Sequence, residues 1–263
     1  MNKYITYLAF FWVSIFLSNC QSTTDKCSIS NDHYSNTKLF KVDTVYTNVD
    51  MGNINCTVKI VKERLNENLE EYPDVSEDEW WEDGAPKLLI VYDNSNCRMI
   101  FRKKIEGMKV VLFKKESDLS KQGNLYVHLI SSGGGSGFTA WTNRFILENG
   151  KLELQQLFQT GELTNIYFNQ NDQEIILLRG IWEMNNENEA HFDPHKQSVS
   201  ICRFGETQFI VEDIGTTKYV YSSENITSNQ MLKNIVNKER NILNVNPTNF
   251  IGFNNWDGTF ENK

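Results

Sequence analysis

Three segments of this chain repeat one pattern: an apolar strand, a polar loop, and a pair of strands joined by a tight turn that contains glycine. The three turns lie at Glu106-Gly107, at Asn149-Gly150 and at Gly205. Asn-Gly between apolar runs is a strong hairpin signal, because a type I′ turn needs positive φ at both central residues. The repeated pattern therefore predicts a mainly antiparallel, all-β domain.

The side chains around the second turn alternate with the period of a strand. Phe145 and Leu147 point to one face before the turn, and Leu152 and Leu154 do so after it. A period of two is typical of a strand and not of a helix. We therefore expect strands on both sides of the turn.

The spacing of the units suggests a repeat architecture. Their turn glycines are separated by 43 and 55 residues, and periods of roughly 40–50 residues are typical of propeller blades. Fourth strands are expected at 165–168 and 218–223, and a further strand region at 38–61 precedes the units. We expect one β-rich domain over 38–263, a small or incomplete β-propeller-like meander, with a β-sandwich as the alternative. The units cover about 87–122, 125–170 and 174–223.

The order of strand, Gly/Ser loop, hairpin and acidic turn before "EII" resembles FG-GAP-type propeller blades of secreted bacterial proteins. "NQNDQEIILL" (Asn169–Leu178) resembles the Asp-rich calcium turn of those blades. Asn169 and Asn171 stand where that family has aspartates, and the turn glycine is absent. The resemblance implies a propeller-like fold. Because the calcium-binding residues of that family are missing here, we predict neither a metal site nor a cofactor for this chain.

One helix is expected near the C-terminus, at about 228–243. Thr227 or Ser228 can cap its start, and Asp257-Gly258 predicts a turn in the tail that follows. The apolar residues that follow a period of 3.6 are Met231, Leu232, Ile235, Val236 and Ile242.

The N-terminus predicts export. Lys3 precedes an apolar run from Tyr4 to Phe16, which is too short to span a bilayer comfortably and fits a signal peptide over 1–19; a signal anchor is the alternative. The "LSNC" that ends at Cys20 resembles the lipobox of bacterial lipoproteins. That resemblance implies cleavage before Cys20, a diacylglyceryl thioether on its sulfur and an acylated (palmitate-type) amino group, followed by a tether over 20–37. Gln21 is not an Asp retention signal, so we predict the outer membrane as the location.

The net charge excludes one class of binding partner. The formal net charge is −8, or −9 once Lys3 is removed with the signal peptide, so nucleic-acid binding is excluded.

Besides Cys20, four cysteines remain, which allow three disulfide pairings in an exported chain or serve as buried thiols. They are Cys27, Cys56, Cys97 and Cys202.

"HFDPH" is the first candidate site. His191, Asp193 and His195 would project to one side of an extended segment, and all three are plausible ligands for a divalent ion. Asp193-Pro194 is also a turn former, which favours a structural loop. This loop over 183–197 has the same place in its unit as those at 93–96 and 132–138. A rim shared by the three loops is the expected binding surface.

The second candidate is "EEYPDVSEDEWWEDG" (Glu70–Gly84), with eight carboxylates and no Lys or Arg. Such a segment is typical of a solvated loop. Trp80 and Trp81 could also anchor a cationic partner or stack on a sugar.

No catalytic motif is present. Gly135-x-Gly137-x-x-Ala140 has the spacing of a dinucleotide fingerprint, but a strand pattern follows it in place of a helix. We expect a lipid-anchored bacterial envelope protein with a binding or assembly role and a protein or glycan partner. The alternatives are an envelope hydrolase that acts on glycan or peptide, and an immunity-type lipoprotein that neutralises a toxin.

Overall fold

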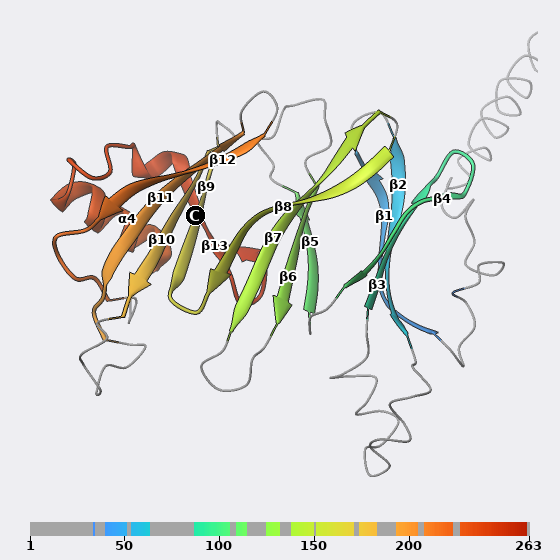
Figure 1. The fold of residues 1–263 in the computed structure, drawn as a ribbon, viewed down its shortest axis with the longest axis horizontal. Helices are drawn as coiled ribbons and strands as arrows, with labels where there is room; N and C mark the ends of the chain where they lie inside the picture. The colour runs from blue at the N-terminus through green and yellow to red at the C-terminus, as the bar shows by residue number, and fades with distance from the viewer. Residues whose placement is uncertain are drawn as a thin grey trace, which may run out of the picture.

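The structure is a computed structural model that describes 12 parts of the chain. They are residues 34, 40–51, 54–63, 87–105, 109–114, 125–131, 138–149, 151–170, 174–182, 193–204, 208–222 and 227–261. Within them the chain forms three antiparallel sheets in chain order, none of them closed, and one α-helix (Figure 1). The predicted all-β meander is therefore confirmed.

The first two sheets are four-stranded meanders in which every strand pairs with the next one along the chain. The first consists of β1 (Phe40–Asp50), β2 (Asn55–Glu63), β3 (Lys87–Asp93) and β4 (Arg98–Ile105). The second consists of β5 (Lys109–Lys114), β6 (Leu125–Ser131), β7 (Thr139–Glu148) and β8 (Lys151–Gly161).

The third sheet has six strands in the order β12-β11-β10-β9-β13-β14, so that the C-terminal hairpin pairs with the edge of a third meander. Its strands are β9 (Thr164–Asn169), β10 (Glu174–Ile181), β11 (Lys196–Phe204), β12 (Phe209–Thr216), β13 (Phe250–Asn254) and β14 (Thr259–Phe260). The helix α4 (Ser228–Lys238) and the short 3₁₀ helix η3 (Pro247–Asn249) lie between β12 and β13 in the chain.

The three sheets pack face to face, because the inner strands carry apolar side chains on both of their faces. Phe101 of β4 meets Phe145 of β7 edge-on at 5.3 Å between ring centroids, within the core shared by the first and second sheets. Tyr126 of β6 and Phe168 of β9 meet at 5.7 Å in the core between the second and third sheets. Three stacked sheets correspond to the propeller-like meander and not to a two-sheet sandwich.

The helix α4 covers the outer face of the third sheet. Thr227 caps its start by accepting a hydrogen bond from the Gln230 N–H, as predicted. Four apolar residues on one side of the helix are buried against Tyr167 and the neighbouring strands: Met231, Leu232, Ile235 and Val236. The helix is shorter than predicted, since it ends at Lys238 and Glu239 forms its C-cap.

One predicted hairpin is wrong. The strands on either side of Asn149-Gly150 and of Gly205 pair as predicted, β7 with β8 and β11 with β12. The strands on either side of Glu106-Gly107 do not pair, because β4 completes the first sheet and β5 begins the second.

The sheets consequently divide the chain at other places than the predicted units at 87–122, 125–170 and 174–223. The strand expected at 165–168 exists, but it begins the third sheet as β9 and does not complete the second. Of the strand expected at 218–223, the structure describes 218–222, and within these residues only Tyr221 makes a bridge, with His195.

Candidate functional site

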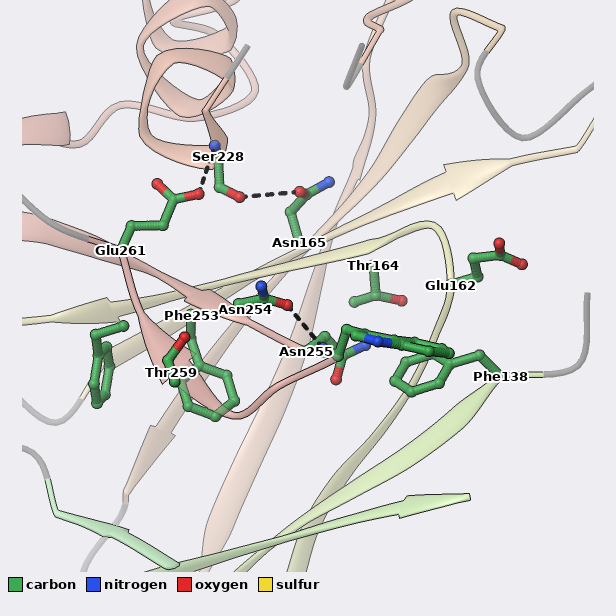
Figure 2. Close-up of a pocket in the computed structure, with 12 residues that line it drawn as sticks. Phe138, Glu162, Thr164, Asn165, Ser228, Phe253, Asn254, Asn255, Thr259 and Glu261 are labelled. Atoms are coloured by element: carbon green, nitrogen blue, oxygen red, sulfur yellow. Dashed lines mark hydrogen bonds between the residues drawn. The ribbon is translucent and has the colours of Figure 1, made fainter. Parts of the chain in front are cut away.

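A cavity of about 520 Å³ lies where the turn after β8, the start of α4 and the β13–β14 hairpin meet (Figure 2). We call it the large pocket. It combines aromatic rings with amides, hydroxyls and carboxylates from segments far apart in the sequence. Its lining residues are Phe138, Glu162, Thr164, Asn165, Ser228, Phe253, Asn254, Asn255, Trp256, Thr259, Phe260 and Glu261.

Trp256 presents an indole ring to solvent at this pocket. It is 63% exposed, and its ring packs on Phe138 at 4.9 Å between centroids. It lies in a tight turn in which Gly258 has a φ of +74°, a value that favours glycine. A Cβ at Gly258 would meet Val111 at 2.8 Å, so the turn lies directly against β5.

Asn255 fixes this turn to the second sheet. Its Nδ2 donates to the Gly161 carbonyl (3.1 Å), and its Oδ1 accepts from the Thr160 hydroxyl (2.8 Å). Its own carbonyl oxygen lies 3.0 Å from His128 Nε2. A carbonyl only accepts, so Nε2 carries the proton, and Nδ1 accepts from the Thr142 hydroxyl at 2.9 Å. Trp256 is thereby held at the mouth of the pocket by a buried polar network.

The opposite wall is the start of α4. The Ser228 and Asn229 N–H groups donate to the two oxygens of the Glu261 carboxylate, at 2.8 and 3.1 Å. A carboxylate is stabilised at a helix N-terminus because it satisfies unpaired N–H groups there. The Ser228 hydroxyl also donates to Asn165 Oδ1 at 3.4 Å. Glu162 of the β8–β9 turn also lines the pocket, and Figure 2 shows it on the side away from Glu261.

A second, small pocket of about 50 Å³ adjoins the first, because Glu162 and Asn165 line both. Two of the three predicted "HFDPH" residues lie in it. Its lining residues are Glu162, Leu163, Asn165, Gly180, Asp193, His195, Gln197, Tyr221 and Met231.

Of the "HFDPH" segment, the structure describes Asp193, Pro194 and His195. Asp193 is exposed whereas His195 is buried, and the His195 backbone pairs with Tyr221 through two hydrogen bonds of 3.0 and 2.8 Å. The His195 ring packs on Trp182, which is 41% exposed, at 5.1 Å between centroids. His191 lies outside the described residues. Within the described parts of the chain, no three His, Cys, Asp or Glu side chains are grouped so that they could hold a metal ion.

The expected rim of three loops stays a prediction, because most of 132–138 and 183–197 lies outside the described residues. Phe138, at the end of 132–138, lines the large pocket, and Asp193, in 183–197, lines the small pocket that adjoins it. The turn at 93–96 lies at the other end of the strand array (Figure 1). It joins the third and fourth strands of its sheet, whereas the other two loops join second and third strands, and successive loops of a meander alternate between ends.

Sequence reasoning missed Trp256, Glu162 and Asn165. The available signal was a tryptophan directly before the predicted Asp257-Gly258 turn, in a tail that is otherwise polar. Of the other predicted site residues, Cys20, Trp80 and Trp81 lie outside the described part of the chain.

Two cysteines are free thiols in the core. Burial raises the pKa of Cys56 to about 11 and that of Cys202 to about 12, so neither is a thiolate at neutral pH. Cys97 is disulfide-bonded, and its partner lies outside the described residues.

In the described parts of the chain, no helix has the length and apolar character needed to cross a membrane. Comparison with protein-family models, with curated proteins and with solved structures finds no match for this chain. The resemblance of its units to FG-GAP-type blades therefore stays a prediction from the sequence.

Proposed function

We propose that this protein is a lipid-anchored envelope protein that binds a saccharide in the large pocket. The observation that carries the proposal is the exposed indole ring of Trp256, fixed on Phe138 beside Glu162 and Asn165. Sugar rings have apolar faces that pack on aromatic rings and hydroxyl groups that need amide and carboxylate partners. The pocket offers both kinds of contact.

Binding is tested with the mature protein on an array of neutral, amino and acidic glycans, followed by calorimetry on the glycans that bind. Trp256→Ala is expected to weaken binding roughly tenfold or more, because the apolar area covered by the sugar is lost. Tyr219→Ala is the matched control, since Tyr219 is an exposed aromatic residue that lines neither pocket. Equal affinities of the two variants, or no glycan bound at all, would reject the proposal.

The anchor is tested separately. Mass spectrometry of Cys20→Ala is expected to show loss of acylation and of membrane retention, whereas Cys27→Ala keeps both. Unchanged retention of Cys20→Ala would contradict the lipoprotein part. Because Cys56 and Cys202 are free thiols and Cys20 would carry lipid, a digest without reductant is expected to link Cys97 to Cys27. Such a disulfide would agree with export to an oxidising compartment.

A hydrolase is the second candidate, because two carboxylates, Glu162 and Glu261, line one pocket. Glycoside hydrolysis uses such a pair, but Glu261 already accepts two N–H groups of α4, so binding is the better supported function. Cleavage of a bound oligosaccharide that disappears in Glu162→Gln would favour the hydrolase. The toxin-neutralising alternative stays a prediction from the sequence.

A further inference from the structure

The segment 217–221 projects from the third sheet directly after β12, which is an edge strand of that sheet. At its first end, the Thr217 N–H donates to the Gln197 carbonyl at 2.9 Å. At its other end, the backbone of Tyr221 pairs with that of His195. The three residues between these contacts lie opposite a single residue of the neighbouring strand, and all three are exposed. They are Lys218, Tyr219 and Val220.

The backbone of this segment is fixed by Glu239, the C-cap of α4. Its carboxylate accepts hydrogen bonds from the N–H groups of Lys218 and Tyr219, at 2.6 and 3.0 Å. The Thr217 hydroxyl donates to the Tyr219 carbonyl at 2.9 Å. Tyr219 and Val220 are 49% and 51% exposed, so a fixed backbone presents two apolar side chains to solvent. Such a surface loses little conformational entropy when it binds.

Three exposed cations lie beside these apolar side chains. Lys218 Nζ is 5.6 Å from the centre of the Tyr219 ring, and Lys238 Nζ is 5.8 Å from that of Tyr221. Arg240 directly follows Glu239. None of the three cations forms an ion pair within the described parts of the chain. The buried carboxylate of Glu239 balances only one of the three charges. We call residues 218–220, together with Lys238 and Arg240, the basic edge.

The basic edge has the chemistry of a surface that lies between water and lipid. Tyrosine places an apolar ring and a polar hydroxyl at the depth of the headgroups, and Lys and Arg are attracted to anionic headgroups. Salt screens charges beyond about 8 Å, so the negative net charge of the whole chain does not cancel this local attraction. A stable protein interface takes about 800 Å² per partner and an apolar centre. Two exposed apolar side chains are too few for that.

We propose that the basic edge is a membrane-contact surface that lies on anionic lipid headgroups, with Tyr219 and Val220 in the interface and the three cations at the phosphates. This inference does not rest on saccharide binding, because none of the five residues lines either pocket. The lipid anchor proposed at Cys20 would hold the chain close to a bilayer, where a weak additional contact is enough to orient the protein.

The test is co-sedimentation of the mature chain (20–263) with lipid vesicles. The chain carries Cys20→Ala, so that no lipid anchor contributes. Vesicles of phosphatidylcholine are compared with vesicles that also contain about one third phosphatidylglycerol. We expect the anionic vesicles to bind roughly tenfold or more tightly and to lose this advantage at about 0.5 M salt, because salt screens the attraction. Equal binding to both kinds of vesicle, or no binding to the anionic ones, would overturn the proposal.

A pair of double variants locates the charges. Lys218→Gln with Lys238→Gln is expected to weaken binding to anionic vesicles roughly 10- to 30-fold, at about fivefold for each cation. Lys103→Gln with Lys104→Gln, at exposed positions of β4 in the first sheet, changes the net charge by the same amount and should leave binding nearly unchanged. A similar loss in both double variants would show an unspecific attraction and overturn the assignment to the basic edge.

A pair of single variants locates the apolar contact. Tyr219→Ala is expected to weaken binding to anionic vesicles severalfold, because its ring no longer enters the interface. Trp256→Ala removes another exposed aromatic ring and should bind these vesicles as the parent chain does. If Tyr219→Ala also binds fully and poly-glutamate displaces the vesicles, the partner is an acidic polypeptide and the membrane assignment fails. Because Trp256 carries the glycan test and Tyr219 the vesicle test, either proposal can fail without the other.

Discussion

His128 is a buried side chain whose neutral form the fold requires. Burial lowers its pKa below the ordinary value of 6.5, and the nearby Lys109 acts in the same direction, although the bond to Asn255 opposes both. Below pH 6.5 the unfolded chain therefore takes up a proton that the folded chain resists. The stability that depends on neutral His128 is therefore fully present above pH 6.5 and is lost progressively as the pH falls below it.

The expected result is a free energy of unfolding that declines as the pH is lowered from about 8 to about 5, with a smaller decline in His128→Gln. Urea unfolding at several pH values in this range measures it. An identical slope in the variant would show that another group is responsible.

Glu239 is a charged residue that is only 2% exposed. Burial alone would raise its pKa, but hydrogen bonds from the Lys218 and Tyr219 N–H groups and the Tyr221 hydroxyl outweigh burial and lower the pKa below 4.5. The stability from this carboxylate is present above pH 4.5 and is lost as the pH falls through the lowered pKa.

Glu239→Gln places an amide where three donors converge. At neutral pH we expect it to reduce the free energy of unfolding by about 1.5–3 kcal/mol, the range for hydrogen bonds to charged groups. Glu212→Gln, which removes an exposed ion pair with Arg203, should cost about 0–1 kcal/mol. Denaturant unfolding compares the two variants, and a similar cost in both would argue against a special role of Glu239.

At the scale of elements, the turn that carries Trp256 depends on strands of another sheet. Thr160 of β8 donates to Asn255 at 2.8 Å but lines neither pocket. Thr160→Val is expected to lower stability by about 1 kcal/mol, to speed amide exchange at 255–258 and to weaken saccharide binding. The measurements are denaturant unfolding, hydrogen exchange and calorimetry.

The control for this effect is Thr57→Val in the first sheet, where the Thr57 hydroxyl donates to Asn94 at 2.7 Å. It should cost a similar amount of stability and leave the affinity unchanged. A Thr160→Val protein with full affinity would show that the turn does not need this anchor.

The hairpins show which elements can be predicted from sequence. The strands on either side of Asn149-Gly150 pair as predicted, because Asn and Gly favour the positive φ of a tight turn, and Asn149 has a φ of +51°. Glu106-Gly107 carries a similar local signal, but whether two strands pair or diverge into different sheets is decided by distant packing. The start of α4 was likewise encoded by its cap at Thr227, whereas its end depends on Glu239 binding a segment some 20 residues away.

The residues of the candidate site also fall into those that a local sequence pattern predicts and those that only distant contacts bring together. Asp193 and His195 were predicted because they are close together in one polar loop. Their neighbours Glu162 and Asn165 reach them only through the order of β9, β10 and β11 in the third sheet. Trp256 reaches the second sheet through Asn255, a contact across 95 residues of sequence, and no local pattern predicts such a contact.

At the scale of the whole molecule, a stack of open sheets has end faces that need a cover. In repeat proteins a terminal cap with a polar outer face serves this purpose. Here α4 covers the end face of the third sheet with one apolar side, and its exposed side includes Lys233 and Lys238. The helix therefore stands where the next sheet of a closed ring would pack.

Leu232 tests this role, because it is fully buried between α4 and the third sheet. Leu232→Ala is expected to lower the free energy of unfolding by about 2–5 kcal/mol and to increase self-association at high concentration, because a loosened helix uncovers an apolar sheet face. Lys233→Ala, on the exposed side of the helix, should change stability by less than about 0.5 kcal/mol. Denaturant unfolding and light scattering measure the two effects. A Leu232→Ala protein with a lowered free energy of unfolding and unchanged self-association would contradict this role. That result would show that α4 contributes to the core but does not serve as the cover of the stack.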